Sequence, residues 1–150
     1  MIKILFICHG NICRSVSAEY IFKQLVNEAG LGDKVYIDSA ATSTEEIGNQ
    51  IYPHMRRTLM EHGVPIGDHR ARQVKRKEYD EFDLIIAMDE ENMYFLGHIL
   101  GDDPEKKIHY LMEYTDAPNS EIEDPWYSRN FEKAYQDILK GCKGLLEELF

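Results

Sequence analysis

The stretch Cys8-His9-Gly10-Asn11-Ile12-Cys13-Arg14-Ser15 follows an apolar run from Ile2 to Ile7 and precedes a helical pattern that begins near Val16. The apolar run is short and rich in β-branched side chains, and it stops abruptly at Gly10 and Asn11. These features predict a buried strand that ends in a tight loop. A strand, a small-residue loop and a helix N-terminus together form an anion-binding site, because successive backbone N–H groups point into the loop.

The side chains of this loop indicate which chemistry the anion site supports. Ser15 is suited to the helix N-cap, and Glu19 lies in the first helical turns, where the helix dipole favours a carboxylate. Cys8 opens the loop and Arg14 closes it, so both would face a bound anion. Arg14 offers a planar fork for two phosphate oxygens. Positive surroundings favour the thiolate of Cys8, which is the nucleophilic form. The loop therefore predicts a phosphate site with a cysteine nucleophile.

Length and composition set the outer limits of the interpretation. The chain has 150 residues, which predicts a single domain spanning residues 1–150 with one sizeable core. The formal net charge is −10, so nucleic acid is not expected as a partner. Three Cys residues without a signal peptide predict a reducing, cytoplasmic location. No apolar run is long enough to span a bilayer, so membrane insertion is not expected.

The rest of the chain alternates between strand and helix patterns. The predicted strands are residues 2–7, 34–38, 83–88 and 107–111, and the predicted helices run from about 16 to 30 or 32, 53–62, 89–100 and 128–149. Asp89 is primarily an N-cap candidate, with any electrostatic role near the site secondary, and Cys142 falls on the core-facing stripe of the last helix. This order predicts an α/β fold, a three-layer sandwich in which a four-stranded parallel sheet is flanked by helices on both faces. Ligands of such sheets lie beyond the carboxyl ends of the strands, where the Cys8 loop emerges.

The Cys-x5-Arg-Ser pattern, with Gly10 and Asn11 inside it and close to the start of a short chain, resembles the low-molecular-weight protein tyrosine phosphatases. The resemblance extends over nearly the whole chain. It implies hydrolysis of phosphotyrosine and aryl phosphomonoesters through a cysteinyl-phosphate intermediate, with Cys8 as nucleophile and Arg14 on the phosphate. It also implies that Ser15 helps Cys8 to leave in the second step. The loop residues expected to contact the substrate are His9, Gly10, Asn11, Ile12, Cys13 and Ser15.

A second motif, Glu123-Asp124-Pro125-Trp126-Tyr127, precedes the last helix. A phenolate leaves slowly unless a positioned carboxylic acid protonates it as it departs. Asp124 is suited to this role, because Pro125 stiffens the loop and the two aromatic residues are placed to flank a substrate ring. The family usually has Asp-Pro-Tyr here, and Trp126 replaces the first tyrosine. The alternative is a structural Asp-Pro turn with Trp126 and Tyr127 in the core.

Two further residues are predicted to support the loop. Ser39 lies in a segment that resembles the family's second strand, and His69 lies in a segment that resembles its His-x-Ala-Arg sequence. The resemblance implies that Ser39 and His69 hold the loop in shape together with Asn11. A strand-end cap for Ser39 and an ordinary surface position for His69 are the alternatives.

The sequence departs from the family at the rim and at the helix start. Glu45 occupies a position where the family often has an aromatic wall, and an acid there would disfavour acidic residues next to the phosphotyrosine. Tyr52 or Ile51 could supply the missing wall. His9 replaces a small or apolar residue and could either add positive charge or obstruct bulky substrates. Val16 replaces the usual proline, which leaves the helix start less rigid.

The resemblance also implies a redox function and a set of partners. Cys8 and Cys13 would form a reversible disulfide that protects the nucleophile from over-oxidation. The alternative for Cys13 is a small buried apolar residue. The expected partners are phosphotyrosine-containing proteins, with inorganic phosphate as product, and a weak homo-oligomer remains open. No cofactor is implied, and no metal-ligand spacing is present.

Three other functions use overlapping residues. Thioredoxin-coupled arsenate reductases share a Cys-x5-Arg loop but need a further cysteine pair, and this chain offers only Cys142. Bacterial protein-arginine phosphatases have threonine where this loop has Ile12, and an apolar side chain suits an aromatic ring better than a guanidinium. A phosphate-binding module without activity would be expected to have lost Cys8 or Asp124, and both are present.

Overall fold

Four parallel strands form the central sheet of the computed structural model, which describes all 150 residues. The strands are β1 (Ile2–Cys8), β2 (Val35–Ala41), β3 (Leu84–Ala87) and β4 (Ile108–Tyr110), in the spatial order β2-β1-β3-β4. Cys8 pairs with Ala41 of β2, and the neighbouring Ile7 pairs with Ala87 of β3. The neighbouring strands β2, β1 and β3 therefore end at the same edge of the sheet, and Cys8 ends the middle strand of these three.

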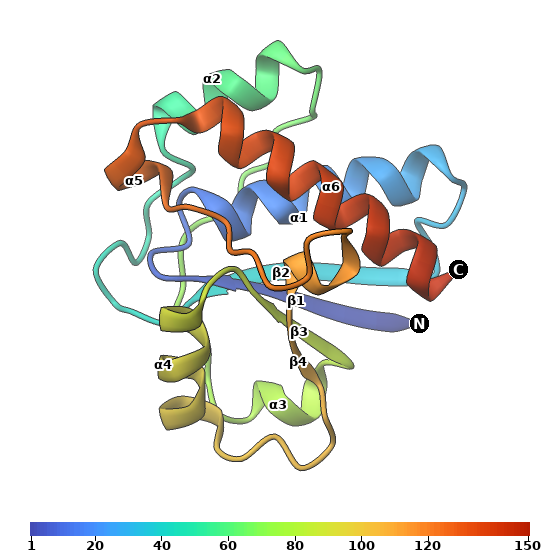
Figure 1. The fold of residues 1–150 in the computed structure, drawn as a ribbon, viewed down its shortest axis with the longest axis vertical. Helices are drawn as coiled ribbons and strands as arrows, with labels where there is room; N and C mark the ends of the chain where they lie inside the picture. Colours follow the sequence, from blue (N-terminus) through green and yellow to red (C-terminus); the bar gives the residue numbers. More distant parts are fainter.

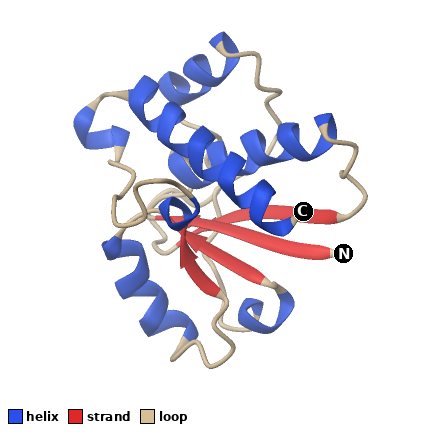
Figure 2. Ribbon diagram, turned by 45° about the vertical axis from the view of Figure 1, so that its right-hand side comes forward, coloured by secondary structure: helices blue, strands red, loops and turns tan.

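Helices cover both faces of this sheet, as Figures 1 and 2 show. One face carries α1 (Arg14–Glu28), α2 (Pro53–Glu61) and α6 (Phe131–Leu149), and the other carries α3 (Glu78–Glu81) and α4 (Glu90–Leu100). The predicted three-layer sandwich with a four-stranded parallel sheet is confirmed.

The side chains of β1 divide between two cores. Ile4 and Phe6 belong to the larger apolar cluster, together with residues of α1 and α6. Leu5 and Ile7 belong to the smaller cluster on the α4 side. All four are fully buried. Successive side chains of a strand point to opposite faces, so a strand covered on both faces is apolar throughout, as this one is.

The N-terminal boundary of α1 differs from the prediction. The helix begins at Arg14 with Cys13 as its N-cap, so the prediction that Ser15 caps the helix is wrong. The Ser15 hydroxyl lies instead beside the Cys8 sulfur and the Asn11 amide. Glu19 lies within the first two turns, as expected, and it is buried. The side chain of Ser15 hydrogen-bonds with the loop, and that of Glu19 accepts a hydrogen bond from Ser39 of β2. Neither side chain caps the helix.

The end of the chain also contains more elements than the sequence pattern indicated. The helix predicted from Ser128 to Leu149 is α6, which begins later, at Phe131, and the loop predicted before it contains the short helix α5 (Pro125–Ser128). A left-handed backbone conformation at Arg129, with φ 60°, separates the two helices. The short α3 and the 3-10 helix η1 (Leu111–Tyr114) were not predicted. Elements of about one turn carry too little periodicity to be recognised.

β2 also extends to Ala41, further than predicted, since it pairs with the whole of β1. Gln73 forms one more parallel bridge with Ala41. None of the helices combines the length and the apolar character that crossing a bilayer requires.

Candidate active site

Three segments that are far apart in sequence meet in one pocket of about 110 Å³ at the carboxyl edge of the sheet. Cys8 ends β1, Arg14 begins α1, and Asp124 is the N-cap of α5. The residues that line the pocket are Cys8, His9, Gly10, Ile12, Cys13, Arg14, Glu45, Glu46, Asp124, Trp126 and Tyr127. The pocket therefore brings together a thiol, a guanidinium and a carboxyl group.

Arg14 is held in one orientation by groups on three sides. Its side chain is only 2% exposed, and Nη1 donates to Asp89 Oδ2 at 2.6 Å and to the Ile122 carbonyl at 2.9 Å. Nη2 lies 3.4 Å from Asp124 Oδ2. Burial by itself lowers the pKa of Arg14, but the negative charges of Cys8, Asp89 and Asp124 outweigh it and raise the pKa above its usual value. Arg14 is therefore a fixed positive charge beside Cys8.

The Cys8 sulfur lies within hydrogen-bond distance of two nearby groups. The Asn11 backbone N–H lies 3.3 Å from Cys8 Sγ, and the Ser15 hydroxyl lies 3.0 Å from it. Both donors lower the energy of negative charge on the sulfur. Cys13, in the same loop, has the opposite character, because burial, followed by the charges of Cys8 and Asp124, raises its thiol pKa well above the usual range. The two loop cysteines are free thiols with different chemistry.

Asn11 connects the loop to the structure beneath it. It adopts φ 60°, a left-handed conformation that asparagine tolerates better than most residues. Its Nδ2 donates to the hydroxyl oxygens of Ser15 at 2.7 Å and Ser39 at 3.0 Å. Its Oδ1 accepts from His69 Nε2 at 2.7 Å and from the backbone N–H of Arg72 at 3.3 Å. The amide thus uses its donors and acceptor fully, and the loop shape depends on it.

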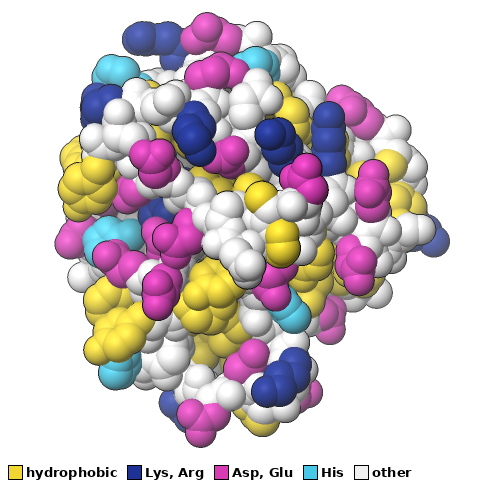
Figure 3. All heavy atoms as spheres, viewed as in Figure 1, with side chains coloured by type: hydrophobic (Ala, Val, Ile, Leu, Met, Phe, Trp, Pro, Cys, Tyr) yellow, Lys and Arg dark blue, Asp and Glu magenta, His cyan; other side chains and the backbone are white.

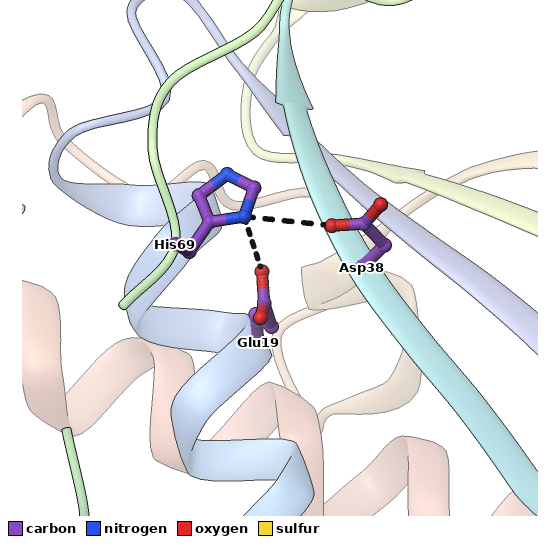
Figure 4. A group of neighbouring side chains, drawn as sticks. All are labelled: Glu19, Asp38 and His69. Carbon is purple, nitrogen blue, oxygen red and sulfur yellow. Dashed lines mark ion pairs between the residues drawn. The ribbon is translucent and has the colours of Figure 1, made fainter. Parts of the chain in front are cut away.

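Figure 4 shows the far end of this network, where His69 faces Glu19 of α1 and Asp38 of β2. His69 Nδ1 lies 3.4 Å from Glu19 Oε1 and 3.5 Å from Asp38 Oδ1. These three side chains could in principle ligate a metal ion. However, Lys23 pairs with Glu19 at 2.6 Å and Arg72 pairs with Asp38 at 2.9 Å, so basic side chains already balance the carboxylates. The cluster fits a supporting network better than a metal centre.

Asp124 lines the pocket from a separate segment, the start of α5. Its Oδ1 accepts the backbone N–H of Trp126 at 3.0 Å, which fixes the carboxyl group at the start of α5. Trp126 is 43% exposed and packs edge-on against Tyr52, with the ring centroids 4.9 Å apart. Tyr127 is 81% exposed. The alternative that placed both aromatic residues in the core is wrong, because they form an exposed wall of the pocket.

The predicted site residues fall into two groups in the structure. Besides Cys8, Arg14 and Asp124, the pocket is lined by His9, Gly10, Ile12, Cys13, Glu45, Glu46, Trp126 and Tyr127, and all but Glu46 were predicted. Asn11, Ser15, Ser39 and His69 lie behind the loop, where their side chains hydrogen-bond with one another. The expected substrate contacts of Asn11 and Ser15 would therefore have to come from the backbone, since their side chains face inward.

Sequence reasoning described some residues around the site only in part and missed one. Asp89 was predicted primarily as an N-cap with a secondary electrostatic role, and it has both roles, since its Oδ1 accepts the Asn92 N–H at 2.8 Å and its second oxygen pairs with Arg14. Glu19 was placed in the first helical turns, but its hydrogen bond from Ser39 at 2.6 Å was not predicted. Glu91, which faces His9, was not singled out at all. The sequence did offer a signal for Glu19, because this acidic residue stands among the apolar positions of the helical pattern, which are the positions that become buried.

Comparisons with known proteins agree with this geometry. Residues 3–150 match the family model described as low molecular weight phosphotyrosine protein phosphatase. The Bacillus subtilis low molecular weight protein-tyrosine-phosphatase YfkJ is 39% identical over 150 aligned residues, which cover 99% of this chain and 96% of that protein. A Rattus norvegicus low molecular weight phosphotyrosine protein phosphatase is 40% identical, with coverage of 97% and 94%.

Solved structures give the same result at the level of the fold. The crystal structure of YfkJ superposes with a TM-score of 0.95 and covers 99% of this chain and 94% of that chain, at 39% identity. A protein tyrosine phosphatase from Entamoeba histolytica superposes with a TM-score of 0.92 at 30% identity, with coverage of 99% and 97%. With this agreement of sequence, fold and pocket, the chain belongs to the low molecular weight phosphotyrosine protein phosphatase family.

Proposed function

We propose that this protein is a tyrosine phosphatase in which Cys8 is the nucleophile, Arg14 binds the phosphate and Asp124 is the general acid. Membership of the family establishes the class of reaction. The assignment of roles is supported by one observation, the convergence of these three side chains on a single pocket. Their separation in sequence makes this meeting a property of the fold.

In the first step, the phosphate docks against the loop N–H groups and the Arg14 guanidinium, which stabilise charge on the equatorial oxygens. The Cys8 thiolate attacks phosphorus in line. A sulfur–phosphorus bond forms as the bond from phosphorus to the phenolic oxygen breaks. Asp124 transfers its proton to that oxygen, so that a neutral phenol leaves.

In the second step, Asp124 is a carboxylate and takes a proton from water. The water oxygen attacks phosphorus, and the sulfur–phosphorus bond breaks to release inorganic phosphate and the thiolate. The Ser15 hydroxyl, 3.0 Å from Cys8 Sγ, stabilises the departing thiolate. Every group in both steps comes from this chain, the substrate or water.

The pocket walls favour an aromatic phosphate ester. Ile12 and Trp126 offer apolar surface to a substrate ring, and the exposed Tyr127 extends this wall. A phosphoarginine guanidinium would have no hydrogen-bond acceptor on Ile12. The net charge of −10 also supports a phosphoprotein substrate rather than nucleic acid. The three free cysteines support a reducing compartment such as the cytoplasm.

The test measures hydrolysis of p-nitrophenyl phosphate, phosphotyrosine and phosphoarginine without added metal. We expect Cys8→Ser to abolish turnover and Asp124→Asn to lower kcat by about a hundredfold or more, as loss of a general acid does. Asp33→Asn, an exposed change of the same kind, serves as the control and should retain wild-type activity. A wild-type protein that binds phosphate but hydrolyses none of the three substrates would instead be a binding module.

A further inference from the structure

The mouth of the pocket has one acidic side. Glu45 and Glu46 reach it from the loop after β2, and Glu91 stands nearby in the first turn of α4. His9 joins two of them, with Nε2 3.0 Å from Glu45 Oε2 and Nδ1 3.5 Å from Glu91 Oε1. Figure 3 shows acidic side chains gathered around a histidine on the left of the molecule, above the region of α4. Glu45, Glu46 and Glu91 together form the acidic rim.

The carboxylates of the acidic rim are accessible to a ligand. The side chains of Glu45 and Glu91 are 68% and 62% exposed, and His9 is the only basic group within ion-pair distance of either. Glu46 has no ion pair and accepts a hydrogen bond from the Asn49 side chain at 2.6 Å. His9 brings at most one positive charge to three carboxylates. The acidic rim therefore keeps a net negative charge in either protonation state of His9.

The pocket also has an aromatic wall. It is formed by Trp126 and Tyr127, and the Arg129 guanidinium lies over the ring of Tyr52, which packs against Trp126, at 5.5 Å from its centroid. A pocket of about 110 Å³ holds a phosphate and part of its ring, so the residues on either side of the phosphotyrosine remain outside. We place the substrate ring against Trp126, and the flanking residues then leave the pocket through the same mouth that Glu45 and Glu46 line.

We propose that Glu45, Glu46 and Glu91 are specificity determinants that select phosphotyrosine flanked by Lys or Arg over phosphotyrosine flanked by Asp or Glu. This inference rests on the phosphatase function proposed above. A flanking cation would be attracted to the acidic rim, and a flanking carboxylate would be repelled by it. Because the carboxylates are exposed, the selection weakens as salt screens them.

The experiment compares three peptides that are identical except for the residues on both sides of the phosphotyrosine, which are Lys, Ala or Glu. We expect kcat/KM to fall in the order Lys, Ala, Glu, with about a tenfold difference between the first and the last at low ionic strength, given several exposed charge pairs. In about 1 M salt, where the screening length is only about 3 Å, the ratio should approach one.

The double variant Glu45→Gln with Glu91→Gln tests the assignment. We expect the Lys-to-Glu ratio to fall to about twofold, because most of the exposed charge is removed. The control is Glu28→Gln with Glu147→Gln, which removes the same charge from exposed positions outside the pocket and should leave the ratio unchanged. The ratio is internal to each variant, so a general loss of activity or stability does not imitate the effect.

Two results would overturn the inference. One is a wild-type ratio near one at low salt, and the other is a ratio that the glutamine variant leaves as high as in the control. In both cases, hydrolysis of p-nitrophenyl phosphate would show that the phosphatase function stands. Failure of the function itself is recognised separately, because the wild-type protein would then not hydrolyse p-nitrophenyl phosphate.

Discussion

The floor of the pocket and its rim are built in opposite ways. Beneath the loop, Asn11, Ser15 and Ser39 are at most 1% exposed and hydrogen-bond with one another. At the rim, Tyr127 is 81% exposed, and the side chain of Glu45 makes its ion pair only with His9. A buried polar group must be paired, whereas an exposed one has water as an alternative partner.

This contrast assigns the chemical reaction to the floor of the pocket and the choice of substrate to its rim. The floor holds Cys8 and Arg14 in one geometry, so a change there removes several interactions at once and affects every substrate. The rim contacts only what lies outside the phosphate. A change there should alter affinity or preference and leave the chemical step intact. Substitutions in both regions can test this division, and those in the floor should have the larger effects.

Arg14→Lys should have the largest effect among such substitutions. Lysine has no fork, so it cannot contact Asp89 and the Ile122 carbonyl as Arg14 does while also meeting two phosphate oxygens. We expect kcat/KM for p-nitrophenyl phosphate to fall by about a hundredfold or more, in line with the loss of an oxyanion-stabilising donor. Steady-state kinetics measure it. Arg57→Lys, at an exposed position on α2, should retain full activity.

The two loop cysteines should also differ strongly in reactivity. Alkylation requires the thiolate, and the raised pKa of Cys13 keeps that thiol protonated. At pH 8 we expect iodoacetamide to modify Cys8 at least about a hundred times faster than Cys13, with loss of activity in step. Labelling of Cys13 should increase only at much higher pH. Peptide mass spectrometry over time measures both rates.

Bound phosphate supplies the control for this labelling experiment, because it should protect Cys8. Cys142, which is fully buried and has a pKa raised by that burial, should stay unmodified in the folded protein. Equal labelling of Cys8 and Cys13 at pH 8 would contradict the contrast between them. The predicted reversible disulfide between these two residues is compatible with it, since only one thiolate is needed to begin the exchange.

Asn11→Ala should affect both stability and turnover. It leaves Ser15, Ser39 and His69 without their shared partner, and it places alanine at φ 60°. We expect a loss of about 3 kcal/mol in the free energy of unfolding and about a tenfold fall in kcat. Urea denaturation and steady-state kinetics measure them. Asn119→Ala, in an exposed loop, is the matched substitution and should change neither quantity. An active, fully stable Asn11→Ala protein would show that the loop keeps its shape without the network.

Trp126→Ala should have the smallest effect, and only on substrate binding. An aromatic contact contributes about 0.5–1.5 kcal/mol, so we expect KM for phosphotyrosine to rise about fivefold with kcat nearly unchanged. Tyr94→Ala, which removes an aromatic side chain that is 63% exposed on α4, should leave KM as it is. A fall in kcat of the same size would contradict this expectation, because the backbone N–H of residue 126 that donates to the Asp124 carboxyl group is retained in alanine.

Much of this architecture could be predicted from the sequence because it depends on local patterns. The period of the apolar residues identified the four strands and the longer helices. The spacing from Cys8 to Arg14, with Asn11 between them, identified the loop. The start of α1 was predicted less accurately, because the Ser15 side chain hydrogen-bonds with Cys8 and Asn11 of the loop, and capping rules do not consider that contact.

The sequence by itself determined the strand, the loop and the helix that carry Cys8 and Arg14, since backbone hydrogen bonding and apolar periodicity act within a few residues. Only the tertiary structure decided that Asp89, 75 positions away, forms an ion pair with Arg14 at 2.6 Å, and that Glu91 faces His9. The physical reason is that Coulomb and hydrogen-bond energies depend on distance and burial in space. The distance between two such side chains, and their burial, are not defined until the sheet has brought their segments together.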